Sequence, residues 1–267
     1  MKKYILILIA ILLPLTYLAG SIQDKHKAVI ARKNVGGAVT YDCSGDLKFG
    51  WGMESTTLTS GTPPGCTDGS VATMTANGTA TLDGTQKSNG TLSARSADAA
   101  DYFYESTNFG AGEFTNAEGK IVFDVYANTY IDGMQPLEIS YNNSTNDELY
   151  IIAASSGDEN DIQWKLNWTS NGTVESGNTV DSSGNITINE WTRITIKWKV
   201  SVDGNDFYIQ ACELTLPDTL GNCYETETDR DLVAWAGEAD RIRIGQSNFI
   251  DSIMYVDNFQ IFATSGY

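Results

Sequence analysis

Histidine is almost absent from this chain. His26 is the single one among 267 residues, and it lies in a basic segment ahead of the part expected to fold. Ser-His-Asp and Cys-His nucleophilic chemistry both need an imidazole at the site, so both are excluded for the folded part. A zinc site is disfavoured too, because the chain has no Cys-x-x-Cys pair to add to that lone histidine.

Positive charge is also scarce. Lys and Arg number 17 against 34 Asp and Glu, which gives a formal net charge of −17. A chain this acidic is repelled by nucleic acid and by anionic membranes. We therefore expect no nucleic-acid partner, and we draw nothing about the fold from the charge.

The first residues carry the one long apolar run of the sequence. Lys2 and Lys3 precede the apolar stretch 4–18, and residues 19–21 are Ala-Gly-Ser, small residues at the spacing that a signal peptidase prefers. The run is short for a membrane-spanning helix, which needs about 20 apolar residues. We predict a signal peptide at 1–21, a flexible basic arm at 22–37 and a folded domain at 38–267. The protein is then secreted, periplasmic or on the cell surface, with no membrane partner after cleavage; an uncleaved N-terminal anchor is the alternative.

The chain has only four cysteines: Cys43, Cys66, Cys212 and Cys223. An even number in an exported chain indicates two disulfides, for which three pairings exist. We favour Cys43–Cys66 and Cys212–Cys223, because each closes a short local loop.

Alternation of apolar and polar residues dominates the rest of the chain, with its centre at residues 191–214. Ile194, Ile196 and Trp198 alternate with charged residues, and Asp203-Gly204 begins a turn before a second alternating stretch. Side chains in a strand point alternately to opposite faces, so this is a hairpin with one apolar face. Proline is scarce and Gly frequent, and about a dozen such strands separated by turn signals are typical of an all-β sandwich or barrel. Further strands are expected at 47–53, 71–81, 90–95, 101–105, 119–130, 137–141, 148–154, 161–168, 185–188, 232–236, 241–245 and 252–262.

Three stretches together resemble the concanavalin A-like lectin/glucanase superfamily, especially its laminin G-like jelly-roll domains. They are LKFGWGME at 47–54 followed by 90–92 and Asp101-Tyr102; EWTRI at 190–194 running into the hairpin; and IRIG at 242–245 followed by YVDNFQI at 255–261. The resemblance covers about residues 40–263. It implies a two-sheet antiparallel jelly-roll sandwich, in which one sheet is concave.

The resemblance also says which catalytic motifs to look for. Glucanases of this superfamily carry E-x-D-x-x-E on one strand, with the two catalytic carboxyl groups about 5–5.5 Å apart in retaining enzymes. Alginate lyases of similar architecture use an Arg/Glu-rich strand and a His–Tyr pair. Neither pattern occurs here: the equivalent stretch, 121–126, holds only Asp124. We therefore predict no enzymatic activity. The alternative is a divergent polysaccharide hydrolase or lyase in which a carboxylate from another strand, such as Glu148, partners Asp124.

The leading hypothesis is a secreted or surface-exposed carbohydrate-binding or adhesion domain, a lectin whose partner is a glycan or polysaccharide. If the apolar side of each strand faces the core, the opposite sides carry polar and aromatic residues that suit sugar recognition on the concave sheet. Antiparallel sandwiches also have solvated sheet faces of this kind without a ligand, and alternation alone does not separate the two readings. A structural surface or appendage subunit that binds other surface proteins is a further alternative. The predicted ligand-binding residues are Asp124, Tyr126, Gln163, Lys165, Asn167, Arg193, Lys197, Tyr208 and Gln210.

Calcium is the one metal that the resemblance suggests. Laminin G-like and related jelly-roll domains often hold Ca²⁺ with Asp, Asn and carbonyl oxygens at a loop rim. The candidate ligands here are Asp101, Asp158, Asp161 and Asp257, none of which has EF-hand spacing. Asp158 and Asp161 also fit a solvated turn, and Asp257 also fits a structural role in which it accepts backbone N–H groups.

Overall fold

The computed structural model describes residues 33–35, 38–43, 45–54, 65–67, 75–76, 81–96, 104–106, 118–129, 134–141, 148–155, 161–170, 173–179, 186–199, 207–215, 218–228, 239–246 and 253–264. The regular elements in these ranges are all β-strands, and their pairings are antiparallel, which confirms the predicted all-β sandwich. The part of the chain described here contains no helix that is long and apolar enough to cross a membrane. The predicted leader at 1–21, Asp101 and Asp158 lie outside the described residues.

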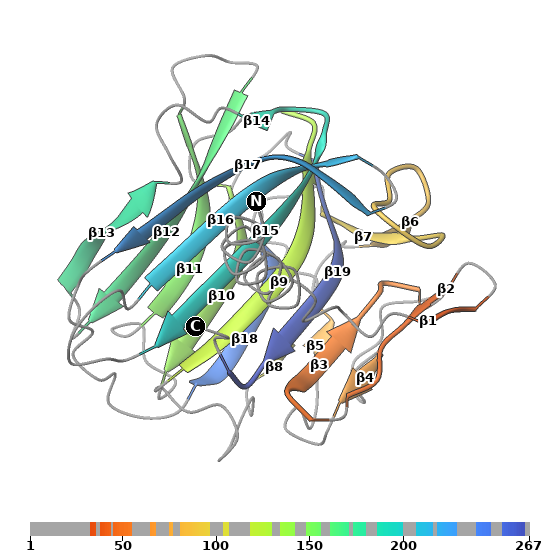
Figure 1. Ribbon diagram of the computed structural model, residues 1–267, viewed down its shortest axis with the longest axis horizontal. Helices are drawn as coiled ribbons and strands as arrows, with labels where there is room; N and C mark the ends of the chain where they lie inside the picture. Colours follow the sequence, from red (N-terminus) through yellow and green to blue (C-terminus); the bar gives the residue numbers. More distant parts are fainter. Residues whose placement is uncertain are drawn as a thin grey trace, which may run out of the picture. The chain divides into compact units, whose positions relative to one another are not determined.

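The strands form two large sheets, and the first of them has nine strands (Figure 1). Its main order is β17-β16-β15-β9-β19-β3-β4; β7 pairs with β19, and β6 pairs with β7. The strands of this sheet are β3 (Leu47–Trp51), β4 (Cys66–Thr67), β6 (Thr81–Asp83), β7 (Ser93–Ser96), β9 (Glu118–Ala127), β15 (Trp191–Lys199), β16 (Phe207–Thr215), β17 (Thr219–Thr228) and β19 (Met254–Phe262).

The second large sheet has eight strands in the order β13-β12-β11-β10-β18-β8-β5, with β14 paired to β12. A separate two-stranded sheet joins β1 (Lys33–Val35) to β2 (Ala38–Thr40), so the segment expected as a flexible arm ends in a strand. The strands of the eight-stranded sheet are β5 (Thr75–Ala76), β8 (Tyr104–Ser106), β10 (Gln135–Tyr141), β11 (Glu148–Ser155), β12 (Asp161–Ser170), β13 (Thr173–Thr179), β14 (Ile186–Thr187) and β18 (Ala239–Gln246).

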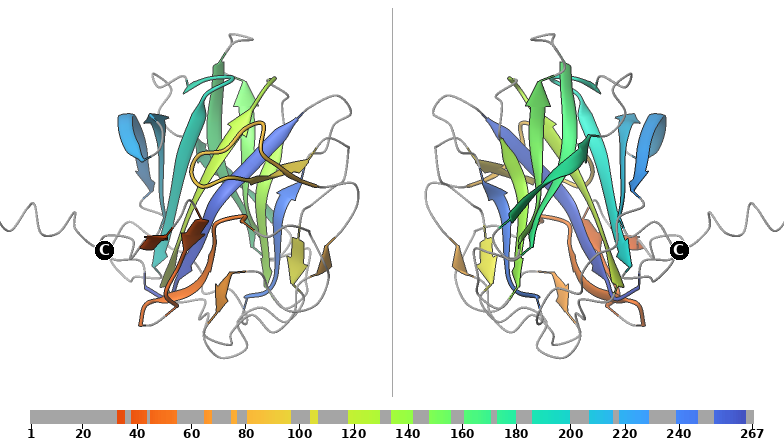
Figure 2. Two further views of the ribbon diagram at one scale, coloured as in Figure 1. Left: turned by 90° about the vertical axis from the view of Figure 1, so that its right-hand side faces the viewer. Right: turned by 90° about the vertical axis from the view of Figure 1, so that its left-hand side faces the viewer.

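The hydrophobic core lies between the two large sheets, which Figure 2 shows from the side. Phe123 and Ile194 of the nine-stranded sheet belong to the same buried cluster as Ile139 and Ile242 of the eight-stranded sheet. Trp51, Trp164 and Trp198 are its largest fully buried side chains. Burial of aromatic and β-branched side chains between two sheets is what stabilises a sandwich, so these tryptophans are core residues and not sugar platforms.

The predicted central hairpin is confirmed as β15 and β16. Ile196 pairs with Ile209 and Trp198 with Phe207 across it. Ile194, Ile196 and Trp198 are completely buried, as their alternation predicts.

One irregularity in β19 reverses the alternation that the sequence predicts for this strand. Asp257 lies opposite Asp124 of β9, but Gln260 lies opposite Val122, so β19 has one extra residue between them. Asn258 adopts a left-handed backbone with φ of 51° at this bulge, which asparagine tolerates better than most residues. Met254 and Val256 therefore face the core before the bulge, and Phe259 and Ile261 face it afterwards.

Both disulfides form with the predicted pairing. Cys43–Cys66 ties the segment before β3 to β4, and Cys212–Cys223 joins β16 to β17. The second bond links residues that lie directly opposite each other. It fixes β17, the outermost strand of the nine-stranded sheet, to its neighbour.

Gly119 is the place where the core leaves no room for a side chain. A Cβ at this position would lie 2.2 Å from Cζ2 of Trp198, which is completely buried. At Gly221, on the exposed β17, a Cβ would come no closer than 3.2 Å, to atoms of Glu213.

We expect Gly119→Ala to lower the free energy of unfolding by about 1–3 kcal/mol, because the overpacked indole must move. Gly221→Ala should change it by less than about 1 kcal/mol. Urea unfolding followed by tryptophan fluorescence measures both, and equal stability of the two variants would contradict the described packing of Trp198.

Candidate functional site

The outer face of the nine-stranded sheet, which is the side away from the core, carries four parallel rows of side chains. Each row runs across neighbouring strands because its members lie opposite one another in the strand register. The aromatic row is Tyr255, Tyr126 and Trp191; the charged row is Asp257, Asp124 and Arg193, continued by Cys212 and Cys223; the amide row is Gln260, Val122, Thr195, Gln210 and Glu225; and the lysine row is Phe262, Lys120, Lys197 and Tyr208.

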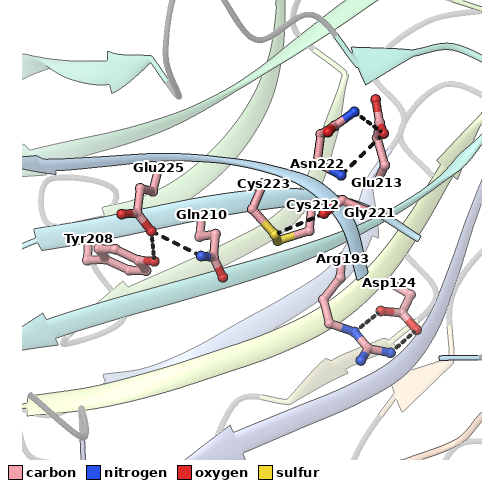
Figure 3. The surroundings of a disulfide bond; sticks show 10 residues. All are labelled: Asp124, Arg193, Tyr208, Gln210, Cys212, Glu213, Gly221, Asn222, Cys223 and Glu225. Atoms are coloured by element: carbon pink, nitrogen blue, oxygen red, sulfur yellow. Dashed lines mark hydrogen bonds and ion pairs between the residues drawn. A yellow bond between two sulfur atoms is a disulfide. The ribbon is translucent and has the colours of Figure 1, made fainter. Parts of the chain in front are cut away.

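The charged row is buried, although it lies on the outer face. Asp124 and Asp257 are 0% exposed and Arg193 is 7% exposed. Arg193 donates from Nε to Oδ1 of Asp124 at 2.7 Å and from Nη2 to Oδ2 at 3.0 Å, a two-pronged ion pair (Figure 3). Its Nη2 also donates to Asp218 at 3.1 Å, from the start of the segment that leads into β17. This geometry holds β9, β15 and the approach to β17 together through one guanidinium.

The segment between β6 and β7 covers the charged row. The Ser88 N–H donates to Oδ2 of Asp257 at 2.9 Å, and the Asn89 N–H donates to the same oxygen at 3.2 Å. The Ser88 hydroxyl donates to Oδ2 of Asp124 at 2.6 Å. Its oxygen lies 3.1 Å from Oδ2 of Asp257, so this one hydroxyl stands between the two carboxyl groups.

The side chain of Asn258 completes the network from the bulge. Its Nδ2 donates to Oδ2 of Asp124 at 2.7 Å and to the Ser88 hydroxyl at 2.6 Å, and its Oδ1 accepts from the Tyr41 hydroxyl at 3.0 Å. Its backbone N–H donates to Oδ1 of Asp257 at 2.7 Å. The bulge thus places a buried amide where it satisfies a carboxylate that a regular strand would not reach.

Burial sets the protonation behaviour of this cluster. Burial, followed by the neighbouring Asp124 charge, raises the pKa of Asp257 well above its usual range, although three backbone N–H donors act in the opposite direction. For Arg193, burial lowers the pKa, but the Asp124 and Asp218 carboxylates outweigh burial and the net shift is upward. Arg193 therefore stays charged, and Asp257 holds a proton to higher pH than an exposed aspartate does.

The aromatic row forms a second small apolar cluster beside the charged row. The Tyr126 ring lies 5.6 Å from the Trp191 ring and 5.7 Å from the Tyr255 ring, and all three side chains are buried. Burial and the neighbouring Tyr255 raise the pKa of Tyr126. Tyr126 is therefore a packing residue, and its ring face is not open to a sugar.

The open part of the face lies in the amide and lysine rows, although Gln260, Val122 and Tyr208 in these rows are buried. Thr195, Gln210, Lys120 and Lys197 are partly exposed, and Glu225 is exposed. Oε2 of Glu225 accepts from the Tyr208 hydroxyl at 2.7 Å and from Nε2 of Gln210 at 3.1 Å (Figure 3). These bonds fix a carboxylate and an amide on the surface in one arrangement.

The structure divides the predicted ligand-binding residues between two sheets. Asp124, Tyr126, Arg193, Lys197, Tyr208 and Gln210 share the outer face of the nine-stranded sheet, whereas Gln163, Lys165 and Asn167 belong to β12 of the eight-stranded sheet. The nine residues therefore do not share the face of one sheet. Alternation along a strand gives the side on which a residue points, but it does not say which strands are neighbours.

Burial removes four of the six residues on the nine-stranded sheet from any exposed patch. Asp124 and Arg193 are bound to each other beneath the β6–β7 segment, and Tyr126 is packed in the aromatic row. The ring of Tyr208 is also covered, because Nζ of Lys197 lies 4.9 Å from its centroid. Lys197 and Gln210 are the predicted residues that remain accessible on the nine-stranded sheet.

The two calcium candidates that the structure describes lie apart. Asp161 begins β12 in the eight-stranded sheet, and Asp257 lies in β19 of the nine-stranded sheet. The oxygens of Asp257 accept from three backbone N–H groups, as a structural carboxyl group does. Within the described ranges, no three His, Cys, Asp or Glu side chains come together in a way that could hold a metal ion.

Several residues of this face were not predicted from the sequence. Lys120 lies on the same side of β9 as Asp124, so alternation was sufficient to find it. Glu225 was missed because its strand, TLGNCYETET, has few apolar residues and does not alternate clearly. Ser88 and Asp218 reach the cluster from segments distant in sequence, and no local pattern marks them.

Loss of Arg193 should destabilise the protein far more than loss of Lys197, an outward residue of the same strand. Arg193→Met leaves the carboxylate of Asp124 buried without its cation, so we expect the free energy of unfolding to fall by about 3–5 kcal/mol. Lys197→Met, two residues along the same strand, removes a partly exposed cation over a ring and should lower it by less than about 1 kcal/mol. Chemical denaturation of both variants compares them, and a similar small loss for each would contradict the buried ion pair.

The raised pKa of Asp257 predicts how stability changes with pH. The folded state keeps the proton at a pH where the unfolded chain, with an aspartate pKa of about 3.9, has lost it. The contribution of Asp257 to stability is therefore complete below that value and is lost as pH rises through the pKa of the folded protein. We expect the difference in unfolding free energy between the wild type and Asp257→Asn to shrink or reverse as pH rises from about 4. Thermal melts at a series of pH values measure it, and parallel curves for the two proteins would refute the raised pKa.

No protein-family model matches this chain, and no curated protein does either. Among solved structures, the binding domain of Paraclostridial Mosquitocidal Protein 1 is similar with a TM-score of 0.50 and 12% identity over 82% of this chain and 49% of that one. The receptor-binding domain of botulinum neurotoxin type G gives 0.48 and 13% over 83% and 48%, and the marine PL-14 alginate lyase from Aplysia kurodai gives 0.45 and 12% over 68% and 86%. The chain spans about half the length of the two toxin domains. At such identities the likeness to the mosquitocidal binding domain shows a shared sandwich fold.

Proposed function

We propose that this is a secreted or surface-exposed, non-catalytic carbohydrate-binding protein, whose glycan lies on the open part of the nine-stranded sheet. The observation that carries the proposal is the fixed pair of polar groups on Gln210 and Glu225, which hydrogen bonds hold in place on an accessible sheet surface. Binding sites for small polar ligands use a few such placed groups, because groups that are already ordered lose little entropy when they bind.

The size of the open part suits a short stretch of a polysaccharide. Lys120, Thr195, Gln210 and Glu225 come from β9, β15, β16 and β17, four consecutive strands of the sheet. Neighbouring strands lie about 4.8 Å apart, so these four span roughly 14 Å. An extended chain of several sugars can lie across them, with its hydroxyl groups facing the hydroxyl of Thr195 and the polar ends of Gln210 and Glu225.

The non-catalytic part of the proposal rests on the burial of the acid pair. Asp124 and Asp257 are carboxyl groups on neighbouring strands, the arrangement that a glycoside hydrolase would need. Both are 0% exposed and are bound to the β6–β7 segment. In this arrangement they stabilise the sheet and cannot reach a glycosidic bond. Glu148, the sequence-based candidate for a partner of Asp124, belongs to β11 in the other sheet.

The two disulfides support an extracellular setting, because such bonds persist in oxidising compartments. The signal peptide at 1–21 and the folded domain that follows it remain part of this proposal.

A structural surface subunit is the second candidate, and β17 favours it. This strand ends the main strand order, and Thr219 to Cys223 are exposed along it, which gives another chain an edge to pair with.

A glycan array with the whole protein tests the proposal. We expect selective binding that is the same with calcium and with EDTA. Gln210→Ala should weaken it by up to about tenfold, the effect of one lost hydrogen bond. Gln163→Ala is the matched control, because Gln163 occupies an outward position on the eight-stranded sheet, and it should leave binding unchanged.

Three results would contradict the proposal. Absence of glycan binding in both conditions would move the assignment to a structural subunit, and so would self-association through β17. Loss of binding in Gln163→Ala, with binding by Gln210→Ala unchanged, would place the glycan on the eight-stranded sheet instead.

A further inference from the structure

The lysine row has an unusual composition for a protein of net charge −17. Lys120 of β9 lies directly opposite Lys197 of β15, and these two are flanked in the same register by Phe262 of β19 and Tyr208 of β16. Like charges directly opposite each other across two strands destabilise a sheet. A pair of lysines is therefore an unfavourable choice for this position if the only requirement is a solvated surface.

Each of the two ammonium groups is held against an aromatic ring. Nζ of Lys120 lies 4.1 Å from the centroid of Phe262, and Nζ of Lys197 lies 4.9 Å from that of Tyr208. The two rings flank the pair of lysines, so an aromatic ring, two ammonium groups and a second ring follow one another across the four strands. Cation–π contacts of this kind are stabilising and favour these positions of the two lysine side chains.

Burial and the neighbouring charge act on Lys120 as well. Burial lowers its pKa, Asp46 acts to raise it, Lys197 lowers it further, and the net direction is downward. The charged form of Lys120 is therefore disfavoured in the protein alone. An anion bound beside the two ammonium groups would oppose both effects, because its charge offsets their repulsion and favours the charged form of the desolvated lysine.

We infer that the lysine row binds the anionic groups of an acidic polysaccharide, carboxylates or sulfates, while the sugar hydroxyls contact the amide row beside it. The two rows are adjacent on β9, β15 and β16: Lys120 and Val122, Lys197 and Thr195, and Tyr208 and Gln210 are successive outward positions. This inference rests on the proposed carbohydrate binding and names the class of glycan. The net negative charge of the protein does not prevent it, because charges more than about 8 Å apart are largely screened at physiological ionic strength.

The test measures binding of the whole protein to four immobilised polymers: polygalacturonate, its fully methyl-esterified form, dextran sulfate and dextran. We expect an acidic polymer to bind at least about tenfold more tightly than its neutral counterpart, because the two ammonium groups attract its anionic groups. A factor of ten corresponds to about 1.4 kcal/mol. Polygalacturonate and dextran sulfate distinguish a carboxylate from a sulfate as the recognised anion.

Four variants assign the binding to the two lysines. Lys120→Met and Lys197→Met should each weaken binding of the acidic polymer by about tenfold. Lys197→Arg keeps the charge and should recover most of it. Lys165→Met, an outward lysine of the eight-stranded sheet, should bind like the wild type. Circular dichroism and a thermal melt of each variant show that a loss of binding is not a loss of folding.

The outcomes separate this inference from the proposed function. Equal affinity for acidic and neutral polymers would overturn the inference, and so would acidic binding that Lys120→Met and Lys197→Met leave intact. If binding to a neutral glycan is nevertheless reduced in Gln210→Ala, the proposed function stands without it. Absence of binding to all four polymers and to the glycan array would overturn both.

Discussion

The ion pair between Asp124 and Arg193 is the interaction on which the outer face of the nine-stranded sheet depends. It joins β9 to β15 in the middle of the sheet, and Arg193 extends the contact to Asp218 before β17. A buried pair of this kind contributes little net stability compared with apolar residues, but removing one partner strongly destabilises the fold because the other charge is left buried alone. Its importance here is therefore geometric. The pair requires Ser88, Asn258 and the β6–β7 segment to complete its hydrogen bonds, so that several distant segments take one arrangement.

This arrangement determines which part of the face is available. The aromatic row and the three charged residues are covered, whereas the accessible side chains lie in the amide and lysine rows, two and four residues further along the strands. Cys212 and Cys223 continue the charged row, so a covalent bond between β16 and β17 follows the ion pair between β9 and β15 along the same row. Gln210, Glu225, Lys120 and Lys197 thus project from strands that are held at their centre. A rigid base of this kind keeps the polar groups in fixed positions, so these groups lose little entropy when an extended ligand binds.

The sequence was sufficient for the fold class and for the faces of the regular strands, but not for the bulge, for exposure or for neighbours. Alternation placed Asp124, Arg193, Lys197 and Gln210 on the outward side correctly, because the side-chain period of a strand is two. It could not reveal that Ser88 lies over Asp124 from 36 residues away, since covering segments leave no local pattern. It also could not reveal that Gln163 belongs to the other sheet, or that Asn258 forms a bulge that moves Phe259 into the core. Register and sheet order arise from the whole chain.

Lysine reactivity in the presence of a polyanion tests the central claim most directly, namely that the open rows of the nine-stranded sheet are the binding surface. Mass spectrometry gives the rate of acetylation of each lysine with and without polygalacturonate or dextran sulfate, so every lysine in the protein serves as a control for the others. We expect slower acetylation of Lys120 and Lys197 when the polymer is bound, and an unchanged rate at Lys165. Protection of Lys165 alone, or rates at all three lysines that the polymer leaves unchanged, would contradict this assignment.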